Sequence, residues 1–230
     1  MHEHLVVPGI GVGDAVGLLV AGVCGLLVAV GFFVHWRVLQ AKIAANRAWA
    51  ARHGFSYIPF DSSVASVSSA EPFGIGWSRR GVDVYRGKYR NFHVMFFRYD
   101  YAPTFGKGTD TVSHQVVALA LPASRPLLDI GHEGFWSKRF GDGIDFENQA
   151  FNDRFKIRSG NGRFAFDVIN ARTMEWMLAD QRAQAYRWRF EGPWLMTFRL
   201  GELKLEEVFF YADFLIDVYA QVPRHVWSTQ

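Results

Sequence analysis

The run AVGLLVAGVCGLLVAVGFFV, residues 15–34, contains no charged side chain. At a rise of 1.5 Å per residue, a helix of this length covers roughly 30 Å, the thickness of the hydrocarbon core of a bilayer. The run therefore predicts a transmembrane helix. We place this helix at residues 15–36, after a short extracytoplasmic N-terminus at residues 1–14.

Three other interpretations explain the run less well. A cleavable signal peptide begins with basic residues, whereas Glu3 and Asp14 precede this run and no Lys or Arg does. The core helix of a soluble protein needs a polar face toward solvent. A helix lying in the membrane plane also needs a polar face, and apolar side chains such as Leu19, Leu26 and Phe32 surround this one. We therefore expect a span.

The basic residues predict the orientation of this span, because Lys and Arg are retained on the cytoplasmic side. The first 36 residues contain no Lys or Arg. A basic juxtamembrane helix is expected to follow at residues 37–54, because this segment contains no Pro and its only Gly is Gly54, where the helix ends. We expect the N-terminus outside, a cytoplasmic domain at residues 55–230, and contacts to lipid headgroups from the basic set Arg37, Lys42, Arg47 and Arg52.

Small residues recur at every fourth position inside the span. They are Gly17, Ala21, Gly25 and Ala29, and they lie on one stripe of a helix. Such stripes let two helix backbones approach closely in a membrane. The pattern predicts a homo-oligomer formed through the transmembrane helix. Gly and Ala are also common in membrane helices that do not associate.

The segment beyond residue 54 has the composition of one folded domain. Aromatic residues make up 16% of the chain, and the net charge is only +3. Basic residues are scattered among acids, which argues against a nucleic-acid partner. The only cysteine, Cys24, lies in the span, so the domain has no disulfide of its own. About 175 residues are sufficient for one sizeable core.

Alternating apolar residues dominate the first half of this domain. We expect a strand at 55–60, a flexible Ser-rich loop at 61–70, and a hairpin formed by 82–86 and 91–99 around Gly87 and Lys88. Further predicted strands lie at 112–121, 127–130, 144–147, 155–158, 163–169, 186–190 and 194–200, the last two flanking a turn at residues 191–193.

Two helices are expected in the second half. Asn170 can cap a helix that runs to about residue 184, and residues 203–222 form an apolar-faced helix that ends at Pro223. Hairpins first and helices late, without regular βαβ alternation, indicate an α+β fold built on a mainly antiparallel sheet.

Several strings resemble a family of actinobacterial single-pass membrane proteins whose soluble part has no assigned activity. The resemblance covers most of the chain. It lies in the span and basic helix ending in Arg52-His-Gly-Phe-Ser-Tyr57, Pro72-Phe73, Phe96 to Tyr101, Leu121-Pro122, Ile144-Asp-Phe-Glu-Asn148, Phe151-Asn-Asp-Arg-Phe155 and Phe164-Ala-Phe-Asp-Val-Ile169 with Met174. It implies an architecture and a cell-membrane location, and it supplies no catalytic residues.

Residues that could carry chemistry are few. Asp142, Asp145 and Glu147 form an acidic cluster, and the last two share a face if residues 144–147 form a regular strand. They could hold a cation or act as an acid and base pair, or simply solvate a turn. The histidines lack zinc-ligand spacing, and no P-loop or G-x-S-x-G motif is present. We therefore assign no catalytic, cofactor or metal residue.

Three functions remain compatible with the sequence. The first is a membrane-anchored cytoplasmic binding or scaffolding module with a membrane or cytoplasmic protein partner, or a lipid partner. The second is a membrane-tethered hydrolase, metal-assisted or acid/base, that uses the acidic cluster. The third is an accessory subunit of a cell-envelope assembly. A pocket that joined the cluster to a histidine would favour the enzyme.

Overall fold

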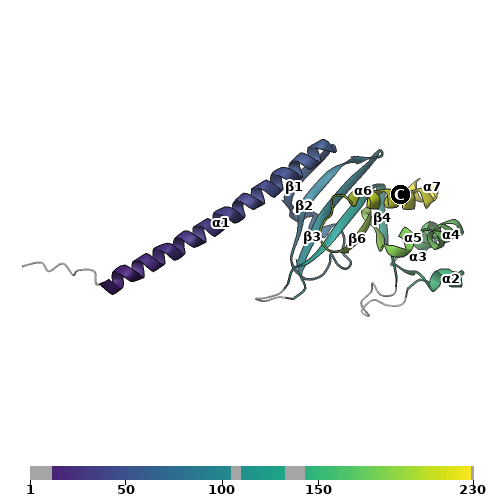
Figure 1. Cartoon of the computed structure of the whole chain (residues 1–230). Coiled ribbons are helices and arrows are strands. Elements are labelled where there is room, and N and C mark those ends of the chain that lie inside the picture. The colour runs from purple at the N-terminus through teal and green to yellow at the C-terminus, as the bar shows by residue number, and fades with distance from the viewer. Residues whose placement is uncertain (1–11, 105–109, 133–142, 229–230) are drawn as a thin grey trace, which may run out of the picture. The chain divides into compact units, whose positions relative to one another are not determined.

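The structure is a computed structural model of the chain, and it describes residues 12–104, 110–132 and 143–228 (Figure 1). The chain divides between Ala48 and Trp49 into two compact units. The first consists mostly of helix α1 (Val12–Arg52), and the second holds the sheet and the remaining helices.

Helix α1 contains a segment long and apolar enough to cross a membrane. Its side chains from residue 19 to residue 39 are exposed, among them Leu26, Val28 and Phe32. Exposed apolar surface of this extent is costly in water and favourable in hydrocarbon. The prediction of one continuous N-terminal helix is confirmed.

A six-stranded antiparallel sheet forms the second unit. Its order is β1 (Phe55–Asp61), β2 (Trp77–Tyr89), β3 (Phe92–Ala102), β4 (Val112–Gly131) and β5 (Lys156–Ser159), and β6 (Trp188–Leu200) pairs with β4. The first half of β4 pairs with β3 and its end pairs with β5, while β6 follows it from His114 to Ile130. The α+β prediction is confirmed.

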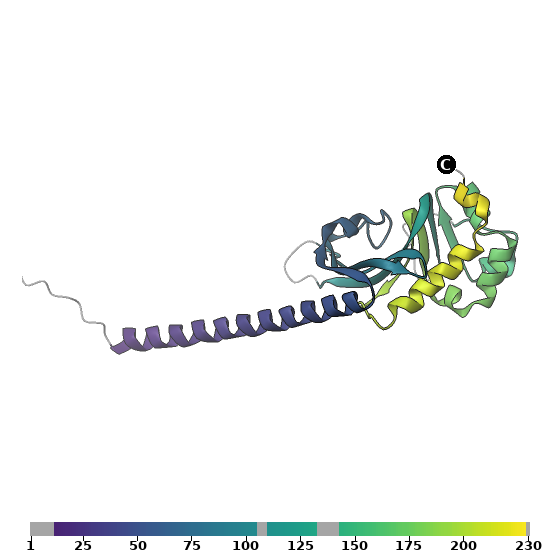
Figure 2. The same cartoon turned by 90° about the horizontal axis from the view of Figure 1, so that it is seen from above.

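The two faces of the sheet carry different covers. Alternate residues of β3 divide between two apolar clusters, with Val94 and Phe96 in the larger and Met95 and Phe97 in the smaller. Helix α6 (Val208–Gln221) lies against β4 and β6 (Figure 2), and its buried side chains belong to the larger cluster. The smaller cluster is covered by Val64 and Phe73, which belong to the segment between β1 and β2.

Short helices complete the second half of the chain. They are α2 (Gln149–Asn152), α3 (Gly162–Val168), α4 (Ala171–Ala179), α5 (Gln181–Ala185) and α7 (Arg224–Ser228). Asn170 caps α4 as predicted, because its side chain accepts a hydrogen bond from the Thr173 amide. The helix expected from residue 203 begins only at Val208.

Some local predictions are wrong. Residues 163–169 form α3 and not a strand, because Asn161 caps the helix and Phe164, Ala165 and Val168 are buried at helical spacing. Residues 144–147 are also not a strand, although the Ile144 amide donates to the Ile157 carbonyl at 2.8 Å.

The hairpin turn lies three residues later than expected. Arg90 and Asn91 adopt φ values of 47° and 68°, which fit a two-residue type I′ turn. Gly87 lies inside β2, where a Cβ atom would stand 2.7 Å from the Phe55 ring. A glycine at position 87 therefore allows close packing against β1 and does not form the turn.

Candidate functional site

Two arginines and an aspartate form a buried ionic cluster where β4 meets β6. The Arg187 guanidinium donates to both carboxylate oxygens of Asp129, from Nε at 3.2 Å and from Nη2 at 2.9 Å, and Arg189 also donates to Asp129. The Asp129 and Arg189 side chains are 3% and 0% exposed. Burial lowers the pKa of Arg189, and the Asp129 charge opposes that shift. Since each buried charge would be costly alone, the three form one unit.

Strand β6 folds back on itself beside this cluster. The Thr197 hydroxyl donates at 2.9 Å to the carbonyl of Arg187, the residue just before β6, although the two are ten residues apart in the chain. The bend lies at Gly192, whose φ is 56°, and Pro193 follows it. The prediction of two strands separated by a turn at residues 191–193 is wrong, because these residues lie inside one continuous strand that bends there.

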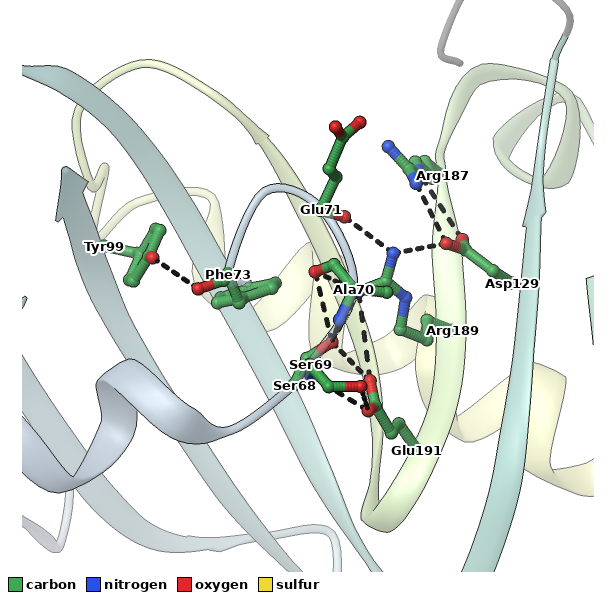
Figure 3. A network of polar contacts seen from close by, with 10 residues as sticks. All are labelled: Ser68, Ser69, Ala70, Glu71, Phe73, Tyr99, Asp129, Arg187, Arg189 and Glu191. Carbon is green, nitrogen blue, oxygen red and sulfur yellow. Dashed lines mark hydrogen bonds and ion pairs between the residues drawn. The ribbon is translucent and has the colours of Figure 1, made fainter. Parts of the chain in front are cut away.

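The segment between β1 and β2 is tied to β6 by hydrogen bonds (Figure 3). Arg189 donates to the Ser68 hydroxyl at 2.5 Å, to the Ala70 carbonyl at 3.0 Å and to the Glu71 carbonyl at 2.7 Å. Glu191 accepts from the hydroxyls of Ser68 and Ser69 and, at 2.9 Å, from the Ser69 amide. A segment expected to be a flexible loop is therefore held at fixed positions, and it also contains the 3₁₀ helix η1 (Ser62–Ser66).

A cavity of about 410 Å³ lies next to this network. Its volume falls in the range typical of sites for small ligands. The lining comes from the β1–β2 segment, from β3, β4 and β6, from the residues just before β6, and from α6. These residues are Glu71, Pro72, Ile75, Tyr101, His114, Ala185, Tyr186, Arg187, Thr197, Phe198, Arg199, Leu200 and Tyr211.

His114 is the imidazole of this lining. Burial, and secondarily the charge of Arg187, lower its pKa to about 4, so the ring is neutral at physiological pH. Its Nδ1 atom is buried and has no hydrogen-bond partner. The ring stacks on Tyr101, with 5.9 Å between ring centroids.

The lining also includes Arg199, which belongs to a second charged group. Arg199 Nη1 donates to the Tyr211 hydroxyl at 2.6 Å and lies 3.4 Å from Glu207, which also pairs with Lys204 at 3.0 Å. The hydrogen bond from Lys204 is the main cause that lowers the pKa of Glu207. One carboxylate thus serves two cations, and the group keeps a positive excess.

The acidic cluster named in the sequence has no such setting. Asp142 lies outside the described residues, and Asp145 and Glu147 are exposed on a segment that is not a strand. Among the residues that the structure describes, no group of three potential metal ligands is found. Neither carboxylate belongs to the lining of the cavity.

The membrane-related residues all lie on α1. Gly17, Ala21, Gly25 and Ala29 are exposed, and nothing lies within 4 Å of a Cβ built on Gly17 or Gly25. Exposed positions near the end of α1 carry the basic set Arg37, Lys42, Arg47 and Arg52. Their contacts to lipid or to a second helix stay predictions.

Sequence reasoning missed the residues of the network and the cavity. One local signal was present: Arg187, Arg189 and Glu191 alternate along a strand with large apolar residues between them. Charges at a spacing of two on a strand share one face, and here that face is buried. Their partners in residues 68–71 and at Asp129 lie too far away in the chain for a local pattern to identify them.

Comparisons with known proteins give one structural likeness to report. No family model and no curated protein matches the sequence. The fold is similar to the crystal structure of the mycobacterial trehalose monomycolate transport factor A, TtfA, with a TM-score of 0.52 and 16% sequence identity. The likeness covers 77% of this chain and 94% of that one. At this identity it shows a shared fold with an actinobacterial protein.

Proposed function

We propose that the protein is a membrane-anchored accessory factor of an assembly that moves lipids of the cell envelope, and that its α+β domain is the binding module. The observation that carries this proposal is the fold likeness along 94% of a mycobacterial transport factor. The sequence resemblance to actinobacterial single-pass membrane proteins agrees with it. Among the hypotheses from the sequence, this one combines the binding module with the accessory subunit.

In this proposal α1 is the anchor and the domain lies in the cytoplasm. The support is the exposed apolar surface of α1 and the absence of Lys and Arg before Arg37. The four basic residues after the span then contact anionic headgroups, each contributing on the order of 1 kcal/mol.

Protease protection tests this topology. We expect a protease added to intact cells to leave the domain whole, and the same protease added to inverted vesicles to digest it. Digestion in intact cells would contradict the proposed orientation. Release of the chain by alkaline carbonate would contradict the span.

Crosslinking in native membranes, followed by affinity purification, tests the accessory role. We expect the full chain to retain the same membrane proteins in repeated purifications, and a variant with Leu26→Arg in the span to lose them. Depletion of the protein should leave an envelope lipid at its site of synthesis. A full chain that retains no partner and whose depletion alters no envelope lipid would refute the proposal.

Self-association through the small-residue stripe is a separate part of the proposal. Gly25→Leu places a large side chain on that stripe, so we expect less dimer in a bilayer association assay. Gly31→Leu is the matched control, because Gly31 is also exposed on α1 and lies about 120° around the helix from Gly25. Equal dimer content in all three chains would exclude this interface.

A further inference from the structure

We propose that the cavity beside β6 binds a single-chain anionic amphiphile. In this arrangement a carboxylate or phosphate headgroup lies near Arg199, and the alkyl chain lies along Ile75 and Leu200. The inference rests on the binding role proposed above for the same domain, and it names the class of ligand.

Charge favours an anion in this cavity. Arg187 and Arg189 share Asp129, and Arg189 also lies 4.0 Å from Glu191, so that group is balanced. Arg199 and Lys204 share Glu207, so this second group keeps a positive excess. Arg187 and Arg199 line the cavity themselves. The lining contains one acidic residue, Glu71, on the β1–β2 segment.

Geometry leaves Arg199 able to reach a ligand. Its side chain is 49% exposed, and its contacts to Tyr211 and Glu207 are made by the single atom Nη1. The guanidinium carries further N–H donors in a planar fork, which suits a carboxylate or a phosphate. Arg187 is less suited to direct contact, because its side chain is buried and paired with Asp129.

His114 is consistent with this charge pattern. The second cause that keeps its ring neutral, after burial, is the positive charge of Arg187. The ring forms a polar but uncharged wall of the cavity, together with the Thr197 and Tyr211 side chains. Such a wall supplies hydrogen-bonding groups, and because it is uncharged it neither repels an anion nor requires one for charge balance.

The apolar part of the lining favours an alkyl chain. Ile75 and Leu200 are 38% and 68% exposed, and both line the cavity, while Pro72 and Phe198 of the same lining are buried. An exposed aliphatic residue alone means little, but two that border a concave site give a chain a surface to cover. Each methylene that this surface removes from water strengthens binding by up to about fourfold.

Calorimetric titration with octanoate tests the inference. The protein is the full chain in phosphatidylcholine nanodiscs, and titration of empty nanodiscs is subtracted. We expect saturable binding of one octanoate, and binding of octanol and of acetate that is about tenfold weaker or more, because each lacks one of the two features. Octyl phosphate in place of octanoate distinguishes the two headgroup sources. Equal affinity for octanol, or no saturable binding above empty discs, overturns the inference.

Two variants of the basic group at Glu207 provide a matched pair. Arg199→Gln should weaken octanoate by about fivefold or more and leave octanol unchanged, since a charge-assisted hydrogen bond is lost. Lys204→Gln likewise removes one positive charge that pairs with Glu207. The Lys204 side chain is 50% exposed, about as much as that of Arg199, but Lys204 does not line the cavity. We expect it to change affinity by less than about twofold. Equal losses in both variants would refute a contact at Arg199.

Glu71→Gln and Leu200→Ser test the remaining two features. Glu71→Gln removes the acid of the lining and should tighten octanoate binding by about twofold. If the cavity instead binds a cation, the same substitution should lower its affinity for that cation, and octanoate should not bind. Leu200→Ser should weaken octanoate and octanol alike, and Ile58→Ser, at an exposed position of β1 outside the cavity, is its control. If Glu71→Gln does not tighten the binding of octanoate, the proposal of an anion site is contradicted.

Failure here differs from failure of the accessory role. If octanoate does not bind while the chain still retains its membrane partners, the ligand class is wrong and the accessory role stands. If octanoate binds with the expected dependence on Arg199 while no partner or lipid phenotype is found, the accessory role is wrong and the ligand class stands.

Discussion

Helix α1 and the region of strand β6 differ in which side chains they expose: the helix exposes apolar ones, and the strand region buries charged ones. The helix leaves Leu26, Val28 and Phe32 exposed, whereas the start of the strand and the residue before it bury Arg189 and Arg187. In the proposed membrane setting hydrocarbon accepts the apolar helix surface. In the domain, Asp129 and the backbone of residues 70 and 71 accept hydrogen bonds from the guanidinium groups. The helix depends on its solvent, and the strand depends on specific partners.

Removing the partner should therefore have the largest effect. Asp129→Asn keeps the shape of the side chain but leaves Arg187 and Arg189 without their shared buried counter-charge, so we expect a loss of about 3–5 kcal/mol in the free energy of unfolding. Denaturant unfolding of the domain, followed by tryptophan fluorescence, measures it. Asp145→Asn, at an exposed site, is the control and should stay within about 0.5 kcal/mol. Equal stability of both variants would mean that the cluster is dispensable.

Changing the solvent dependence of the helix comes next. Leu26→Arg places a charge near the middle of the apolar run, and an Arg there costs about 3 kcal/mol in insertion free energy. The inserted fraction in a translation assay with microsomes should fall, while Leu26→Phe should leave it unchanged. Full insertion of the Arg variant would argue that α1 does not meet hydrocarbon at this position.

The pH dependence of His114 sharpens the comparison inside the domain. Its pKa is about 4 in the fold and near 6.5 in the unfolded chain, so the unfolded state binds a proton first as pH falls. The contribution of neutral His114 to the free energy of unfolding is fully present above about pH 6.5. It falls progressively toward pH 4, by on the order of 2 kcal/mol.

His114→Gln removes this titration, so its thermal midpoint should fall less than that of the unmodified chain between pH 7 and pH 4.5. His93→Gln, at an exposed position of β3, is the matched control and should follow the unmodified chain. Parallel curves for all three proteins would show that His114 does not titrate in this window.

The smallest expected effect concerns the contact between the β1–β2 segment and β6. Ser69→Ala removes the hydroxyl that donates to Glu191 at 2.6 Å, and the exposed site limits the loss to about 1 kcal/mol. Ser66→Ala removes a local hydrogen bond to the Ser63 carbonyl and serves as the control. Hydrogen exchange at residues 68–71 should rise only in the first variant. A rise in both would mean that the segment is held by local turns.

Sequence reasoning succeeded where a pattern is local and failed where partners are distant. The apolar part of α1 follows from the charge-free run at residues 15–34, and Gly192 with Pro193 marks where β6 bends, although the strand continues through them. The apolar spacing of Phe164, Ala165 and Val168 was misread as a strand, because a short apolar run suits both periods and the Asn161 cap decided between them.

The site itself could not be predicted from local signals. Strands expected at 112–121 and 127–130 form one strand, β4, that continues through Pro122 and Pro126 because β6 pairs along both halves. The cavity joins Glu71 to Tyr211 across most of the domain. Only the fold brings such residues together, whereas the acidic cluster is visible in the sequence because its residues are close along the chain.

The pairing of β4 also orders events during synthesis. Its ladder needs β3, which precedes it, but also β5 and β6, so the strand is incomplete until residue 200 has left the ribosome. Contacts between residues so far apart in the chain form slowly. If α1 is the proposed anchor, it is translated before these strands and enters the bilayer while their edges are still unpaired. A chain anchored in this way would have its unpaired edges held at a surface, which limits their contacts with other nascent chains.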